Sequence, residues 1–261
     1  MRKNIIKEKL QRKKQVFGIW QGINSMSLVE ICGYSGFDFI IFDTEHGVMD
    51  VESCIPMVCA AEKFDIVPIA RVIEIKKSFI LKALDIGMMG IIFPMVNTRE
   101  DAERAVSLSK YVERDEYGKK YFRGLSSSSR AAGYGLGVDK KTHIKSSNEE
   151  ILLIAQLETL DAVQNLDEIL KVKGIDVIFI GRGDLSQSLG LPGDVSNAEV
   201  TKVTEASIKK IIQAGKVAGV VEGNIDSIRH WAELGVDFIS CSQTSIISKA
   251  ISSMSKKLKN I

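Results

Sequence analysis

The most constraining feature of this sequence is a short pattern that recurs along the chain: a glycine, an apolar residue, an aspartate and then an apolar run. Full copies cover Gly36–Phe42, Gly174–Ile180 and Gly235–Cys241, and looser copies begin at Gly87 and Gly215. A glycine at the end of a helix readily adopts the left-handed cap conformation. The apolar run suits a strand that is buried on both faces of a parallel sheet. Each copy therefore predicts the end of a helix followed by a buried parallel strand.

Eight such runs occur along the chain, and segments with helical periodicity separate them. The predicted strands are Val16–Trp20, Phe39–Asp43, Val67–Arg71, Gly90–Pro94, Leu152–Glu158, Val177–Gly181, Val217–Val221 and Phe238–Ser242. The predicted helices between them include Val51–Lys63, Ser78–Leu84, Asp161–Leu170 and Ser196–Ala214. Regular alternation of strand and helix predicts a parallel sheet with helical crossovers. Eight units in 261 residues is the count of a (β/α)₈ TIM barrel, so we expect one α/β barrel domain over residues 1–261.

A doubly wound open sheet is the alternative fold. Such a sheet usually carries a glycine-rich phosphate-binding turn after its first strand. Here the sequence QGINSMS follows Trp20, which does not have that character. The sequence therefore favours the barrel.

Two segments lie outside the repeat. The first 14 residues hold seven Lys or Arg and predict a solvated leading helix that covers the bottom of the barrel, with a surface for an anionic partner as the alternative. The second segment, Val112–Asn148, is long for a connection without structure of its own. Because it is rich in serine and glycine, we expect a mobile functional loop at the mouth of the barrel.

Composition and charge exclude several classes of protein. Lys and Arg number 35 against 33 Asp and Glu, so the net charge of +2 gives no basic footprint for a nucleic acid. The longest apolar run, Gly87–Val96, is much shorter than the roughly 18 residues of a membrane helix. The charged N-terminus lacks the apolar segment of a secretory signal. We expect a cytoplasmic protein that binds neither nucleic acid nor membrane.

The cysteines carry no metal or disulfide signal. The four residues show neither a CxxC pair nor a histidine at zinc spacing: Cys32, Cys54, Cys59 and Cys241. We therefore expect free thiols in a reducing compartment, buried as packing residues.

Polar residues close several of the apolar strands, which is the strongest functional signal in the sequence. In barrels of this type the chemistry lies at the carboxyl ends of the strands, and charged residues beside a core are rarely buried without partners. The polar strand ends are Trp20-Gln21, Asp43-Thr44-Glu45-His46-Gly47, Arg71, Gln156-Leu157-Glu158-Thr159 and Gly181-Arg182-Gly183-Asp184. These residues are expected to converge on one rim.

Two carboxylates, Glu158 and Asp184, end neighbouring strands of the predicted barrel, which lie about 5 Å apart. Carboxylates this close repel each other unless a cation or a proton lies between them. A hard divalent ion such as Mg²⁺ or Mn²⁺ commonly takes one or two carboxylates together with substrate oxygens. Each carboxylate could instead cap the helix that follows it. Their position at adjacent strand ends favours a metal site.

His46 and Arg71 are the other candidates for chemistry. His46 shares its loop with Asp43 and Glu45, and a carboxylate beside an imidazole makes a base that works near pH 7. Arg71 keeps its charge and can hold a carboxylate or an enolate. His230, in a helical segment, and His143, in a polar stretch, are expected to be inert.

Taken together, these motifs resemble the HpcH/HpaI aldolase family. The resemblance rests on DTEHG at 43–47, ARV at 70–72, QLET at 156–159 and GxxDLSxSLG at 181–190, and it extends from about Phe17 to Thr244. Its members are class II, metal-dependent pyruvate aldolases with a barrel fold. The chain departs from the family at one position, because Arg182 stands where the family usually has proline. Arg182 is expected to add a cation beside the keto-acid site.

The resemblance implies a role for each matching residue. It makes Glu158 and Asp184 the metal ligands, His46 with Asp43 the base acting through a water on the metal, and Arg71 the group that binds the keto acid and stabilises the pyruvate enolate. It places the substrate-binding role on Trp20, Arg71, Gln156, Gly183, Asp184 and Arg123. It also implies Mg²⁺ or Mn²⁺, with Co²⁺ or Zn²⁺ as alternatives, and a homo-oligomer, a hexamer or trimer of dimers, with a terminal helix near Ile246–Leu258 at an interface.

The implied reaction cleaves a 4-hydroxy-2-oxo acid into pyruvate and an aldehyde. No lysine ends a predicted strand, so a Schiff-base mechanism is disfavoured. The alternatives are an acyl-CoA lyase of the citrate-lyase β type, whose relatives do not use the histidine loop, and a non-catalytic barrel that serves as a binding module. A phosphate-binding barrel isomerase would need a glycine-rich grip after the last two strands, where the chain reads VVEGN and SCSQTS.

Overall fold

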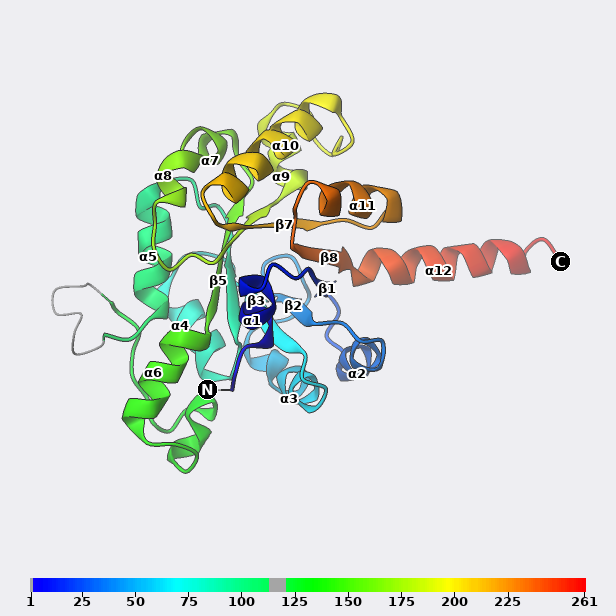
Figure 1. The fold of residues 1–261 in the computed structure, drawn as a ribbon. Helices are drawn as coiled ribbons and strands as arrows, with labels where there is room; N and C mark the ends of the chain where they lie inside the picture. The colour runs from blue at the N-terminus through cyan, green and yellow to red at the C-terminus, as the bar shows by residue number, and fades with distance from the viewer. Residues whose placement is uncertain (1, 113–120) are drawn as a thin grey trace.

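A computed structural model describes residues 2–112 and 121–261, and a closed parallel barrel forms its centre (Figure 1). The strands pair in chain order, and β8 pairs back with β1 to close the sheet. They are β1 Val16–Gln21, β2 Phe39–Asp43, β3 Val67–Arg71, β4 Gly90–Phe93, β5 Leu152–Leu157, β6 Val177–Ile180, β7 Val217–Val221 and β8 Phe238–Ser242. The (β/α)₈ prediction is therefore confirmed, and closure between β8 and β1 excludes the open sheet.

Helices surround the barrel and connect its strands. They are α1 Ile5–Gln11, α2 Met26–Tyr34, α3 Ile55–Lys63, α4 Lys77–Asp85, α5 Arg99–Ser109, α6 Lys140–Glu150, α7 Leu160–Gln164, α8 Leu166–Leu170, α9 Arg182–Ser188, α10 Ala198–Gln213, α11 Ile225–Glu233 and α12 Gln243–Leu258. The glycine that follows α2, Gly36, has a φ of +81°, and Gly174 and Gly235 also adopt positive φ. The recurring glycine therefore ends helices in the left-handed conformation, as the pattern predicted.

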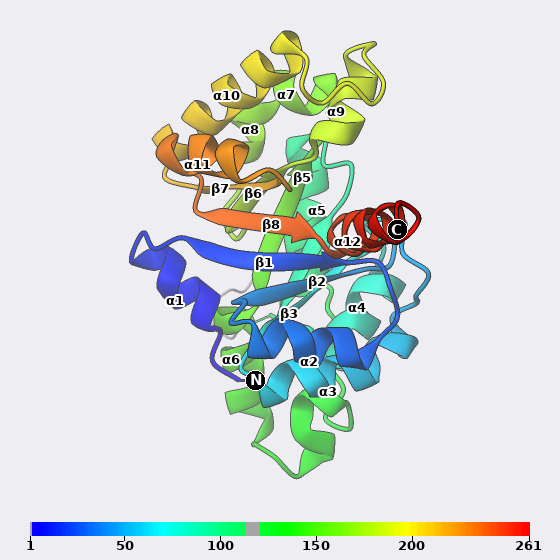
Figure 2. The same ribbon diagram turned by 90° about the vertical axis from the view of Figure 1, so that its right-hand side faces the viewer.

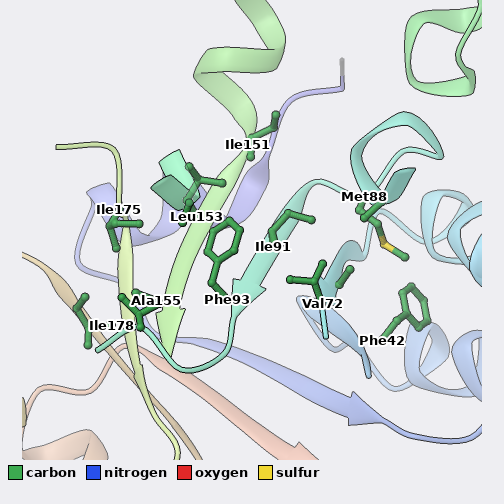
Figure 3. Close-up of a cluster of buried hydrophobic side chains, with 14 of the residues drawn as sticks. Phe42, Val72, Met88, Ile91, Phe93, Ile151, Leu153, Ala155, Ile175 and Ile178 are labelled. Carbon is green, nitrogen blue, oxygen red and sulfur yellow. The ribbon is translucent and has the colours of Figure 1, made fainter. Parts of the chain in front are cut away.

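The strands are buried on both faces, which explains their unbroken apolar runs. On the outer face, side chains such as Phe42, Phe93 and Ile178 pack among the surrounding helices (Figure 3). Inside the barrel, Phe39 stacks on Phe238 with ring centroids 4.1 Å apart. The interior is thus filled with side chains rather than open, which leaves the carboxyl ends of the strands as the place for a site.

Helix α1 closes the amino-terminal end of the barrel, as predicted for a leading helix (Figure 2). Its Ile6 and Leu10 belong to the cluster that fills the barrel interior. Asn4 caps the helix by accepting from the Ile6 N–H, and its amide nitrogen donates to the carbonyl of Met89 at 3.1 Å. Basic residues of the segment pair within the chain, for example Lys9 with Asp38. These pairings favour the structural role over a surface for an anionic partner.

The segment between α5 and β5 does not lie where the sequence suggested. In its described part, Arg130 pairs with Glu62 near the end of α3 and donates to the carbonyl of Ile86, just after α4, at 3.0 Å. The ends of these helices lie at the amino-terminal side of the barrel. The prediction of a mobile loop at the mouth is therefore wrong for residues 121–148, which include α6 and a 3₁₀ segment, Arg130–Gly135. The part of the prediction that concerns residues 113–120 lies outside the described residues.

Helix α12 projects away from the barrel, and much of its apolar surface is exposed (Figure 1). The exposed apolar residues on it are Ile246, Ile251, Met254 and Leu258. Across the described residues, no helix combines the length and the apolar character required to cross a membrane.

The cysteine prediction is only half right. All four are free thiols, and Cys32 and Cys54 are buried. Cys59 is exposed and Cys241 is half-buried. Cys59 lies on the outer side of α3, where Arg130 approaches its Sγ atom at 3.2 Å, so the apolar helix pattern did not place it in the core.

Candidate active site

A cavity of about 560 Å³ opens at the carboxyl ends of the strands. Its lining includes predicted site residues from five strands or the loops that follow them: Trp20, Asp43, His46, Arg71, Gln156, Gly183 and Asp184. A larger hollow of about 800 Å³ lies on the outside between α5 and α8, among residues such as Arg104 and Lys171. The strand-end cavity brings acids, an arginine and a histidine together, so it is the candidate active site.

An ion pair between Asp43 and Arg71 forms one wall of the cavity. The two residues are direct register partners at the ends of β2 and β3. Arg71 donates from Nε to Oδ1 at 2.9 Å and from Nη2 to Oδ2 at 2.6 Å, and both side chains are at most 8% exposed. Trp20 donates from Nε1 to Oδ2 at 3.2 Å and lies beneath the guanidinium. Burial opposes the charge on Asp43, but the hydrogen bonds and charge of Arg71 prevail and lower the pKa of this carboxyl.

The loop from Asp43 to Gly47 is held tightly by its own backbone. The Asp43 carboxylate accepts from the backbone N–H groups of Glu45 and His46, at 3.1 and 3.2 Å. A Cβ atom on Gly47 would lie 2.0 Å from the carbonyl oxygen of Asp43, so the turn requires glycine. We expected Asp43 to orient the imidazole of His46 directly. In the structure its carboxylate fixes the His46 backbone and binds Arg71, while the imidazole borders the cavity.

Glu158 is buried just beyond the end of β5, next to the β6 end that leads to Asp184. It is 2% exposed, accepts from the Met95 N–H at 2.7 Å and also accepts from Nε2 of Gln156. Burial, together with the negative charges of Asp184 and Glu45, raises the pKa of Glu158 to about 7 against the effect of its hydrogen bonds. The groups around Glu158 therefore do not, on balance, stabilise its negative charge.

The donor set fits a hard divalent cation. A cation between the carboxylates of Glu158 and Asp184 would offset the burial that raises the pKa of Glu158. The buried Oε1 atom of Gln156 has no hydrogen-bond partner, so a free oxygen acceptor lies beside these carboxylates. Among the described residues, no three His, Cys, Asp or Glu side chains form a metal cluster. The site thus matches an ion that takes two carboxylates and completes its shell with other oxygens.

The first turn of α9 borders this site. A Cβ atom on Gly183 would meet nothing within 4 Å, so the backbone there faces open space. A Cβ atom on Gly181 would lie 2.9 Å from Glu158 and Gln156, so a glycine is needed for their close approach. Arg182 was expected to add a cation to the site, but its guanidinium pairs with Glu222 after β7, Nη1 to Oε2, at 2.9 Å. Glu222 was missed as a functional residue, although it too is a polar residue that ends an apolar strand.

Glu158 is buried behind Gly181 and is not part of the cavity lining. Arg123 is the predicted site residue that lies far from the cavity of this chain. It lies at the opposite end of the barrel, fully buried, 4.2 Å above the ring of Tyr111 and 3.8 Å from Asp85 at the end of α4. His143 is buried near it, next to Tyr111. His230 is at the surface, as expected, and contacts Glu205 at 2.9 Å.

Fold and site together define a barrel enzyme whose strand ends hold an arginine, a histidine and Asp184 in one cavity, with Glu158 buried beside it. Comparison with known families gives the more specific result. The model of the HpcH/HpaI aldolase/citrate lyase family matches residues 16–246, and the chain belongs to this family. The resemblance found in the motifs is thereby confirmed, and with it the assignment as an enzyme of the aldolase class.

Individual relatives agree with the family match. The chain is 34% identical over 238 residues to the 2-keto-3-deoxy-L-rhamnonate aldolase of Escherichia coli K12. The aligned region covers 91% of this chain and 86% of that protein. Among solved structures, an HpcH/HpaI family protein from Burkholderia cenocepacia superposes with a TM-score of 0.91 at 25% identity, covering 98% of this chain and 99% of the other. The citrate synthase SbnG superposes with a TM-score of 0.85 at 30% identity, covering 97% of both chains.

Proposed function

We propose that residues 1–261 form a single-domain, divalent-metal-dependent pyruvate aldolase that cleaves a 4-hydroxy-2-oxo acid into pyruvate and an aldehyde. One observation carries the proposal: Asp184, the Asp43–Arg71 ion pair and His46 meet around one cavity, and Glu158 is buried directly behind its Gln156 and Gly181. This set supplies ligands for a cation, a fixed positive charge and a base within one pocket. The same reaction read backwards joins pyruvate to an aldehyde.

The carboxylates of Glu158 and Asp184 would hold the cation, with Gln156 supporting Glu158 by a hydrogen bond. When bound, Mg²⁺ or Mn²⁺ supplies a Lewis acid that stabilises negative charge on the 2-oxo acid. The all-oxygen donor set favours these hard ions over Zn²⁺, although Co²⁺ and Zn²⁺ remain to be tested. The backbone at Gly183 and Asp184 faces open space and would receive the carboxylate of the substrate.

His46 would then move the proton of the substrate hydroxyl, and Arg71 would stabilise the negative charge of the enolate. His46 takes the proton from the C4 hydroxyl, the C4–O bond becomes a carbonyl and the C3–C4 bond breaks. The electron pair of that bond becomes the pyruvate enolate, whose negative charge Arg71 stabilises. Asp43 and Trp20 keep Arg71 in place. Delivery of the proton held by His46 to C3 then gives pyruvate, so atoms and charge balance.

We also propose that the chain is a cytoplasmic homo-oligomer, a hexamer or trimer of dimers. The exposed apolar side chains of α12, including Ile251 and Met254, support this proposal because contiguous apolar surface commonly marks an interface. A 2-oxo acid and an aldehyde would be its small-molecule partners, without nucleic acid or membrane.

The test is enolisation of pyruvate, which needs no knowledge of the aldehyde. Chain stripped with EDTA should not exchange the methyl protons of pyruvate for deuterium, and Mn²⁺ or Mg²⁺ should restore the exchange, read by mass spectrometry. His46→Ala should slow aldol cleavage about 10²–10⁴-fold while leaving Mn²⁺ affinity near that of the wild type. Exchange that continues in EDTA would refute the metal assignment. Turnover only with oxaloacetate and acetyl-CoA would instead support the acyl-CoA chemistry, and no turnover of any of these would support the non-catalytic binding module.

A further inference from the structure

The guanidinium of Arg182 is held through both Nη atoms by groups of its own chain, while its buried Nε atom has no hydrogen-bond partner. Its Nη1 atom donates to Oε2 of Glu222 at 2.9 Å, and its Nη2 atom donates to the carbonyl of Val195 in the segment between α9 and α10. Its Cζ atom lies 4.9 Å above the ring of Trp231 on α11. The side chains of Arg182 and Glu222 are 10% and 17% exposed, so water screens their attraction only in part.

Glu222 is itself fixed for this role. Its Oε1 atom accepts from the backbone N–H groups of Gly223, at 2.7 Å, and Asn224, at 3.1 Å, while Oε2 receives Arg182. Its own backbone N–H donates to the carbonyl of Ser240 on β8. The carboxylate therefore cannot swing away without losing several hydrogen bonds, and it neutralises Arg182 in a fixed position.

The other arginine of the cavity, Arg71, is also paired with carboxylates, and the proposed reaction already uses it for the enolate. Arg71 binds Asp43 through two hydrogen bonds and lies 3.0 Å from a carboxylate oxygen of Glu45. Arg71 and Arg182 are the Arg or Lys side chains among the described residues that line the cavity. Much of the rest of the lining is uncharged, including Ile23, Val48, Val221, Ser242 and Thr244.

We propose that Glu222 is a specificity-determining residue which cancels the charge of Arg182, so that the site accepts short neutral aldehydes, apolar or hydroxylated, and disfavours aldehydes that carry a carboxylate. This inference rests on the proposed aldolase function and adds the class of the acceptor. Binding the anionic tail of an aldehyde beside Arg182 would require an unpaired cation, because a desolvated carboxylate without a partner is strongly unfavourable. Arg182 would supply that cation only if Glu222 released it.

The test compares two aldehydes of similar size, butanal and succinic semialdehyde, each offered with pyruvate and Mn²⁺. The measured quantity is the ratio of their kcat/KM values. Wild type should favour butanal. Glu222→Gln keeps the shape and the acceptor oxygen but removes the charge, so it should shift the ratio toward succinic semialdehyde about tenfold, equivalent to about 1.4 kcal/mol.

Two variants control for structural effects. The double variant Arg182→Gln with Glu222→Gln removes the released cation and should return the ratio to the wild-type side. Glu62→Gln also frees an arginine, Arg130, but at the far end of the barrel, and should leave the ratio unchanged. Thermal melting of each variant reports whether it is folded.

The outcomes separate the two proposals. A wild type that prefers succinic semialdehyde, or a Glu222→Gln variant that exchanges pyruvate protons normally but keeps the wild-type ratio, overturns this inference and leaves the aldolase proposal intact. A shift that persists in the double variant also overturns it, because Arg182 would then not be the cause. Wild type that never exchanges pyruvate protons with Mn²⁺ overturns the proposed function and this inference with it.

Discussion

Replacing Gly181 by alanine would test whether the close packing behind Glu158 organises the site. The added Cβ atom would lie 2.9 Å from Cβ and Oε2 of Glu158 and from Nε2 of Gln156. Ordinary contacts between such atoms are about 3.5–4.0 Å, so the two side chains must retreat by roughly 0.5–1 Å. Overpacking of this kind costs about 1–3 kcal/mol, and exchange of glycine for alanine returns about 0.4–1 kcal/mol through the unfolded chain. We therefore expect a net loss of about 0.5–2 kcal/mol, or about 1–8 °C in Tm.

The larger effect of Gly181→Ala should be on the cation. Disturbing the partners of metal ligands typically lowers metal affinity by about 10–100-fold, and here the ligand itself is displaced. Calorimetric titration of Mn²⁺ into EDTA-stripped chain measures the affinity, and scanning calorimetry measures Tm. Gly223→Ala is the matched control, because a Cβ atom there meets nothing within 4 Å. If Gly181→Ala binds Mn²⁺ as tightly as the control does, the reasoning about Glu158 is refuted.

Two further predictions concern stability and assembly. Burial lowers the pKa of His143 from its ordinary value of 6.5, and the charge of Arg123 lowers it further. Because the unfolded chain then protonates His143 more readily than the folded chain, the free energy of unfolding decreases as the pH drops below about 6.5. Urea unfolding between pH 7.5 and 5 should show a smaller loss for His143→Phe than for wild type, and equal losses would contradict the assignment. In sedimentation the wild type should be an oligomer that dissociates when Ile251 on α12 becomes lysine, whereas a monomeric wild type would rule out the proposed assembly.

The strands were predictable because the parallel barrel buries both of their faces. Runs such as Phe39–Asp43 and Phe238–Ser242 match β2 and β8 at both ends, since an apolar strand and a polar loop meet sharply there. Helix ends were also predictable where a glycine such as Gly36 or Gly174 takes the positive φ that ends a helix. Strand ends at one rim were enough to gather most of the candidate site, because the topology of a barrel places every carboxyl end on one side.

The sequence did not reveal which side chains pair between the ends of neighbouring strands. Asp43 lies three residues from His46, but its carboxylate binds Arg71, 28 residues away, because register places them opposite each other. The partner of Arg182 is 40 residues distant and was not foreseen. Arg123 was placed in the site by resemblance, and loop composition could not say at which end of the barrel it lies.

Helix α1 covers the amino-terminal end of the barrel, and this affects how substrates and products can enter and leave the site. Ile6 and Leu10 close the amino-terminal end, so the cavity has its opening at the strand carboxyl ends. For the proposed reaction, pyruvate would lie deeper, near Glu158, and the aldehyde nearer to the loops that carry Val48 and Thr244. If both products share this opening, the proposed reaction is ordered: in cleavage the aldehyde would leave before pyruvate, and in condensation pyruvate would enter before the aldehyde.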